Sequence, residues 1–86
     1  MALSAEDRAV LDLERSWWLE WSTKQDAICS GLSRSPAYYY AALRRIVDLP
    51  EAVEYDPLVT LRVRRRIADQ RRSRHAGAAQ IGRRPR

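Results

Sequence analysis

Two short pairs, each a hydrogen-bond acceptor followed by proline, determine where helices can begin in this chain. In Ser35-Pro36 and Asp56-Pro57, the first residue can accept hydrogen bonds from the free N–H groups at the start of a helix. Proline fits the first helical position because the N–H that it lacks would have no partner there. The pairs therefore predict that a helix starts at each of these two places.

Apolar spacing predicts two further helices in the first part of the chain. Val10, Leu13 and Trp17 recur at helical spacing, and the tryptophans of "SWWLEW" are expected to form most of the aromatic core. Ile28 and Leu32 share one side of a second, shorter helix. Each of these helices follows a serine or threonine that can cap its first N–H groups.

The four helices define an all-α fold. Their expected boundaries are about 5–19, 24–32, 36–48 and 57–75, and the acidic connector between the last two has room for one short turn. Residues 1–75 are predicted to form one small domain, with three helices in a helix-turn-helix arrangement and a longer arginine-rich fourth helix. Residues 76–86 combine Gly, Pro and Arg without periodicity, which predicts a disordered basic tail.

Three consecutive tyrosines follow the first cap-proline pair, and only one of them can face the core from a helix. Tyr39 shares a face with Leu43 and is predicted to be buried. Tyr38 is predicted to face a DNA groove. Tyr40 is expected at the flank, near a phosphate or the first helix.

Charge is distributed very unevenly along the chain. Residues 1–61 carry six basic and ten acidic side chains, whereas residues 62–86 carry ten arginines and one acidic residue, Asp69. Such a cluster attracts a polyanion, most often nucleic acid. The alternative is a solvated tail in a chain that uses arginine in place of lysine.

The predicted helices over 24–32 and 36–48, joined by the turn "SRS", match the layout of a helix-turn-helix. Small residues on the outer face of the second helix would let its backbone approach the floor of the major groove. The alternative is a helical bundle with a solvated arginine face. The residues predicted to contact DNA are Lys24, Arg34, Ser35, Ala37, Tyr38, Ala41, Arg44, Arg45, Arg62, Arg64, Arg65, Arg66, Arg71 and Arg72.

No combination of residues in the sequence predicts catalysis. One histidine, His75, and one cysteine, Cys29, make no triad, and there is no glycine-rich phosphate loop and no metal-ligand cluster. We therefore expect no enzyme activity, no cofactor and no metal, and we interpret Cys29 as a packed structural thiol. The carboxylates are interpreted as solubilising groups or helix caps, namely Asp12, Glu14, Glu20, Glu51, Glu54 and Asp56.

The sequence also predicts where the protein resides. A single cysteine excludes an internal disulfide and fits a reducing compartment. No apolar stretch approaches the roughly 20 residues of a membrane span, and the first residues lack the pattern of a signal peptide. We expect a cytoplasmic, nucleoid-associated protein, with no membrane partner, as a monomer or a homodimer.

Several motifs resemble those of a known family. They are "ERSWW" (14–18), "KQDAI" (24–28), the tyrosine pair at 39–40 and "DPLV" (56–59), followed by the arginine-rich run. Over roughly residues 3–72 the chain resembles a family of short actinobacterial proteins, with relatives in actinobacterial phages, catalogued as domain of unknown function 3263. The resemblance implies a helix-turn-helix-like fold. It places Ser33 at a position where the family has glycine.

Three functions are compatible with these features. The first is a small DNA-binding transcriptional regulator, with its third helix in the major groove of double-stranded DNA and its arginine-rich helix on the phosphates. The second is a module that binds the host transcription or cell-division machinery, with exposed tryptophans as hot spots and the arginine-rich helix as an anchor. The third is RNA binding through the arginine-rich helix.

Overall fold

The computed structural model describes residues 3–83, with the side chains of residues 3–74, and every regular element in this range is helical. The all-α prediction is therefore confirmed. A short 3-10 turn, η1, follows the first helix, and a π-helical turn, η2, continues the second. In chain order the elements are α1 (Ala5–Ser16), η1 (Trp17–Leu19), α2 (Lys24–Asp26), η2 (Ala27–Gly31), α3 (Pro36–Ile46), α4 (Pro50–Tyr55) and α5 (Pro57–Arg83).

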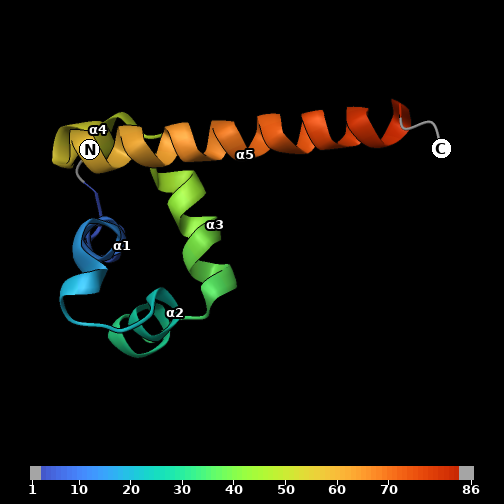
Figure 1. Cartoon of the computed structure of the whole chain (residues 1–86). Coiled ribbons are helices and arrows are strands. Elements are labelled where there is room, and N and C mark those ends of the chain that lie inside the picture. The colour runs from blue at the N-terminus through green and yellow to red at the C-terminus, as the bar shows by residue number, and fades with distance from the viewer. Residues whose placement is uncertain (1–2, 84–86) are drawn as a thin grey trace.

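The helices form a compact body from which α5 projects. In Figure 1, α1 lies beside α3, α2 lies at the end of the body opposite α5, and α5 crosses above α1 and α3 before extending past them. The short helix α4 packs along the first turns of α5. The core therefore lies where α1, α3 and the first part of α5 meet.

Both acceptor–proline pairs cap helices as predicted. The Ser35 hydroxyl accepts a hydrogen bond from the Tyr38 N–H at 3.1 Å, at the start of α3. The Asp56 carboxylate accepts one from the Val59 N–H at 3.2 Å, at the start of α5. These bonds satisfy N–H groups that have no partner inside the helix. The two starts predicted from local sequence are therefore confirmed.

The core combines aliphatic side chains from all the main helices with one aromatic ring. Tyr39 has no exposed surface, whereas Tyr38 and Tyr40 are 43% and 37% exposed, so the prediction that Tyr39 alone of the three tyrosines is buried is confirmed. The larger aliphatic side chains of this buried cluster are Val10, Leu11, Ile28, Leu43, Ile46, Val47, Val59 and Val63.

The prediction that "SWWLEW" forms most of the aromatic core is wrong. Trp18 is 53% exposed, and Trp17 and Trp21 are only half-buried. The regular helix ends at Ser16, and the tighter 3-10 turn that follows interrupts the helical spacing on which the prediction depended. The buried side of α1 runs instead through Val10, Leu11 and Glu14.

Two element boundaries also differ from prediction. The acidic connector before α5 contains a helix, α4, that begins at Pro50. Helix α5 continues to Arg83, past the expected end near residue 75, since the alanines after that point favour helix strongly enough to tolerate glycine. The remainder of the predicted basic tail, residues 84–86, lies outside the described residues.

The turn between η2 and α3 contains the one described non-glycine residue with a positive φ. Ser33 has φ of 57°, in the left-handed region, and it occupies the position where the family resemblance places glycine. The next residue, Arg34, donates its N–H to the carbonyl of Ile28 at 3.3 Å, which closes the end of η2. This backbone geometry lets the chain reverse between η2 and α3.

Ser33→Gly is expected to stabilise the fold by about 1 kcal/mol, because a left-handed conformation costs an L-residue about 1–2 kcal/mol that glycine does not incur. Urea unfolding of the two chains measures the difference. Ser30→Gly is the matched control, since Ser30 is exposed within the helical turn η2. The control should lose stability. A Ser33→Gly chain no more stable than the control would contradict the strain at Ser33.

Candidate nucleic-acid interface

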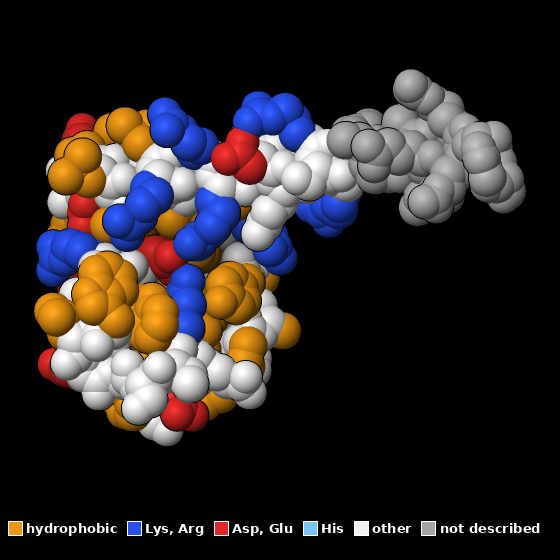
Figure 2. All heavy atoms as spheres, in the orientation of Figure 1, with side chains coloured by type: hydrophobic (Ala, Val, Ile, Leu, Met, Phe, Trp, Pro, Cys, Tyr) orange, Lys and Arg blue, Asp and Glu red, His pale blue; other side chains and the backbone are white. Residues whose placement is uncertain are grey.

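The largest group of exposed basic side chains lies on α5. Figure 2 shows Lys and Arg side chains gathered over this helix and on the face of the body next to it. Arg72 pairs with Asp69 one turn earlier on the same helix. Four other exposed arginines have no carboxylate partner within the part of the chain that the structure describes, namely Arg62, Arg65, Arg71 and Arg74. We call these four residues the free arginines of α5.

Arg64 does not join them, although the sequence predicted that it contacts DNA. Its side chain is half-buried, and its Nε donates to the carbonyl of Val47 at the end of α3. The last carbonyls of a helix lack partners inside the helix and carry partial negative charge, so a cation there is favourable. Arg64 therefore joins α5 to α3, and this bond leaves its guanidinium less available to a phosphate than those of the exposed arginines.

A buried carboxylate on α1 connects this helix to α2, α3 and α5. Glu14, on α1, is only 3% exposed, and Lys24 approaches it to 2.7 Å. Arg66 of α5 approaches it to 2.9 Å, and the Tyr39 hydroxyl donates to it at 2.6 Å. We call these four residues the Glu14 network. The interpretation of Glu14 as a solubilising group or cap is wrong, because Glu14 lies one turn after Val10 on the buried side of α1.

The surroundings of Glu14 act on its pKa in opposite directions. Burial raises the pKa, but hydrogen bonds from Lys24 and Tyr39, the Lys24 charge and the Arg66 hydrogen bond together outweigh burial and lower it. Burial and the hydrogen bond to Glu14 raise the pKa of the Tyr39 phenol well above its ordinary value. Glu14 is therefore a carboxylate at neutral pH, with Tyr39 as its neutral donor.

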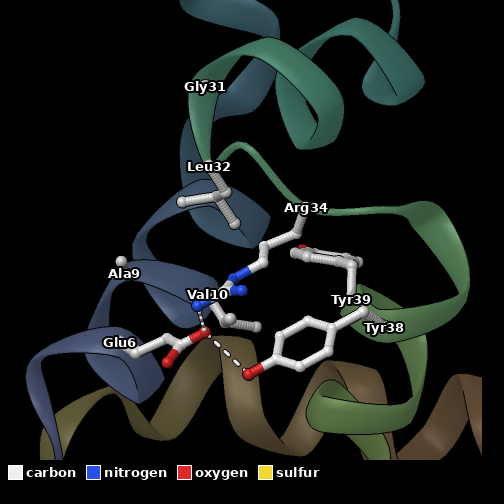
Figure 3. Close-up of a pocket in the computed structure, with 8 residues that line it drawn as sticks. All are labelled: Glu6, Ala9, Val10, Gly31, Leu32, Arg34, Tyr38 and Tyr39. Carbon is white, nitrogen blue, oxygen red and sulfur yellow. Dashed lines mark hydrogen bonds and ion pairs between the residues drawn. The ribbon is translucent and has the colours of Figure 1, made fainter.

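A second set of contacts joins the N-terminal end of α3, and Arg34 just before it, to the first turn of α1 (Figure 3). Glu6 accepts a hydrogen bond from the Tyr38 hydroxyl at 2.7 Å and pairs with Arg34 at 2.9 Å. The Arg34 guanidinium lies 4.7 Å from the centre of the Tyr38 ring. Nearby, Asp7 pairs with Arg45 at 2.9 Å. We call Glu6 and Asp7 the α1 carboxylates.

These contacts change the interpretation of one flank of α3. Arg34, Tyr38 and Arg45 are exposed, as the sequence predicted, but each is already bonded to one of the α1 carboxylates. The hydrogen bond to Glu6 raises the pKa of Tyr38, and the bond to Asp7 raises the pKa of Arg45. Two positive and two negative charges balance here, so this flank offers little attraction to a phosphate.

The remaining predicted residues of α3 lie on its open side. Ala37, Ala41 and Arg44 are exposed, and Arg44 has no carboxylate partner among the described residues. Ser35 is used by the cap of α3. Tyr40 contacts α2, where the Lys24 ammonium lies 5.3 Å from its ring centre. The structure thus brings together the open side of α3, Lys24 and Arg66, and separates them from the flank occupied by the α1 carboxylates.

No other part of the described chain offers a comparable site. Cys29 is exposed, so its interpretation as a packed thiol is wrong; only Ala27 and Ile28 of its helical turn are buried. Among the described residues, no group of three or more His, Cys, Asp or Glu side chains is placed to hold a metal ion. Within that same range, no helix combines the length and the apolar character that a membrane span requires.

Comparison with known proteins identifies the family. Residues 2–75 match a family model described as "Protein of unknown function (DUF3263)". Because this match covers most of the chain, the protein belongs to that family, as the motifs predicted. No curated protein and no solved structure matches the chain.

Glu14→Gln is expected to reduce the loss of stability in acid. The pKa of Glu14 is lower in the folded chain than its ordinary value of 4.5, so the unfolded chain binds a proton more readily. Its carboxylate stabilises the fold fully above about pH 4.5, and this contribution is lost as the pH falls through the lower folded value. At neutral pH the substitution should cost about 2 kcal/mol, because the charge-assisted hydrogen bonds of Lys24 and Arg66 to Glu14 lose their negative acceptor.

Urea unfolding near pH 7 and about pH 3.5 tests this expectation. The decrease in unfolding free energy between the two pH values should be smaller in Glu14→Gln than in the unsubstituted chain. Glu54→Gln is the matched control, since Glu54 is an exposed carboxylate. The control should show the full decrease, and an equal decrease in all three chains would show that Glu14 does not carry the effect.

Proposed function

We propose that this protein binds double-stranded DNA and acts as a transcriptional regulator. The observation that carries the proposal is the set of four free arginines on α5, a helix that projects from the body (Figure 1). Phosphate contacts by Lys and Arg supply most of the sequence-independent affinity for DNA, because each contact releases counterions. An arginine already paired with a carboxylate contributes less, which is why the unpaired ones matter most.

Helix α3 supports the proposal on its open side. Ala37 and Ala41 leave its backbone accessible, and Arg44 adjoins them without a competing carboxylate among the described residues. A helix with small outer residues can approach base edges in the major groove, and an arginine beside them can bind guanine or phosphate. We infer that α3 faces the groove with this side, while the α1 carboxylates keep the opposite flank away from the phosphates.

We expect the double variant Arg71→Gln, Arg74→Gln to show a shallower salt dependence of DNA binding. The slope of log affinity against log salt concentration should decrease in magnitude by about two, because each lost phosphate contact decreases it by about one. Fluorescence anisotropy on a labelled random-sequence duplex, across a range of sodium chloride concentrations, measures this slope. Affinity should fall by a similar factor for all duplex sequences, because phosphate contacts carry no sequence information.

The control removes the same net charge elsewhere. Gln25→Glu with Ser30→Glu changes two exposed residues on α2 and η2, at the end of the body opposite α5 (Figure 1). This chain should keep a salt slope close to that of the unsubstituted protein. If both double variants lower the slope equally, net charge and not α5 governs binding. If the unsubstituted protein does not bind duplex DNA even at low salt, the proposed function is wrong.

One observation favours the second function, a module that binds the host transcription or cell-division machinery. Trp18 and Leu19 are 53% and 74% exposed. Beside them lies a cavity of about 250 Å³ that Trp17 and Trp21 line, with the carboxylates of Asp12 and Glu20. Exposed tryptophans next to a partly apolar cavity are typical of interaction hot spots.

A pull-down from nuclease-treated host extract separates this second function from DNA binding. RNA polymerase subunits or division proteins should be recovered by the unsubstituted chain and lost with Trp18→Ala, which leaves the free arginines of α5 unchanged. Leu61→Ala is the control, since Leu61 is a comparably exposed apolar residue on α5 and does not line this cavity. Equal recovery by both variants would exclude Trp18 as a hot spot.

A further inference from the structure

A notch lies where α2, α3 and α5 approach one another. Its volume is about 300 Å³, and apolar side chains of α3 and α5 form part of its lining. The polar side chains that line it are Lys24, Tyr40, Arg44, Arg66 and Gln70. We call this cavity the α3–α5 notch. It adjoins the open side of α3 and the point where α5 leaves the body.

The charges around the α3–α5 notch are unbalanced. Lys24, Arg44 and Arg66 contribute three positive charges, and none of the residues that line the notch is acidic. Glu14 pairs with Lys24 at 2.7 Å and with Arg66 at 2.9 Å, so one carboxylate serves two cations. Arg44 has no carboxylate partner among the described residues. An excess of positive charge therefore remains, and Arg44 is the cation best able to bind an anion there.

Tyr40 provides a second kind of contact in the notch. Tyr40 is 37% exposed, and its ring stands edge-on to the Tyr39 ring, with centroids 5.1 Å apart. Lys24 lies over the same ring, at 5.3 Å from its centre. The Tyr40 hydroxyl has no hydrogen-bond partner in the described part of the chain, so it is available as a donor. The notch thus combines cations, a free hydroxyl and apolar surface in the lining of one cavity.

Sugar–phosphate groups match this combination. A phosphate diester carries one negative charge that arginine binds with two parallel hydrogen bonds, and a tyrosine hydroxyl is a common second donor. The attached deoxyribose presents carbon atoms that can rest on apolar side chains. A free anion such as chloride would use the charge but leave the apolar surface unoccupied.

We propose that the α3–α5 notch seats one backbone phosphate of bound DNA, with Arg44 as its main ligand and Tyr40 as a second donor beside the sugar. This inference rests on the proposed DNA-binding function and adds a fixed contact to it. The free arginines of α5 can bind phosphates at many positions along the duplex. A notch that holds one phosphate at the junction of α3 and α5 would set which part of the groove α3 meets.

The test compares Arg44→Gln with Arg62→Gln in duplex binding. Both residues are exposed arginines, but Arg62 does not line the notch. Each variant should lower the salt slope by about one. Arg44→Gln should also lower affinity about tenfold at moderate salt, because a charge-assisted hydrogen bond in a formed site is lost. Tyr40→Phe alone should weaken duplex binding. Added to Arg44→Gln it should have no further effect, since the two residues bind the same phosphate.

Nuclear magnetic resonance with two probes identifies the source of the phosphate. A 16-base-pair duplex should shift the Arg44 and Tyr40 side-chain signals, and adenosine monophosphate at the same phosphate concentration should shift them far less. Equal or larger shifts with adenosine monophosphate would overturn the backbone assignment in favour of a free nucleotide. If the unsubstituted chain binds duplex DNA but Arg44→Gln leaves slope and affinity unchanged, the notch proposal fails while the proposed function stands. Absence of any duplex binding overturns both.

Discussion

The arrangement of the helices depends on one buried carboxylate. Glu14 would cost several kcal/mol in a protein interior without partners, because its charge is removed from water. Three donors from different helical segments converge on it, namely Lys24, Tyr39 and Arg66. Aliphatic side chains can slide past one another at modest cost, but an ion pair loses most of its energy when its hydrogen bonds are broken. The Glu14 network therefore favours the observed relative positions of α1, α3 and α5 over positions in which one helix is shifted along another.

Local chemistry was sufficient to predict where most helices begin and which tyrosine is buried. Ser35-Pro36 and Asp56-Pro57 act within four residues of themselves, so nothing distant can override them easily. The buried side of α1 was not predictable in the same way. Glu14 is tolerated there because Lys24, Tyr39 and Arg66 bond to it, and the last two lie 25 and 52 residues away along the chain. The tryptophans were misplaced for a related reason, since a local change of helix type removed them from the core.

The sequence predicted which types of residue the candidate site contains, but it did not predict how the fold arranges them. The cluster of arginines in the sequence predicted a polyanionic ligand. It did not show which of these arginines pair with groups of the protein itself. The fold assigns Arg34 and Arg45 to the α1 carboxylates, Arg64 to a helix end and Arg66 to Glu14. The arginines that remain unpaired among the described residues lie along α5 and at Arg44. A count of charges is therefore a weaker guide to binding than the list of charges left without partners.

The length of α5 has a consequence for the size of any DNA site. The helix contains 27 residues, and at 1.5 Å per residue it is about 40 Å long. One turn of B-form DNA occupies about 34–36 Å. Because the first turns of α5 pack on the body, the proposed contact of this helix with DNA spans at most about one turn on one side of the duplex. Oligonucleotides much shorter than about twelve base pairs would leave part of the helix without phosphates to contact.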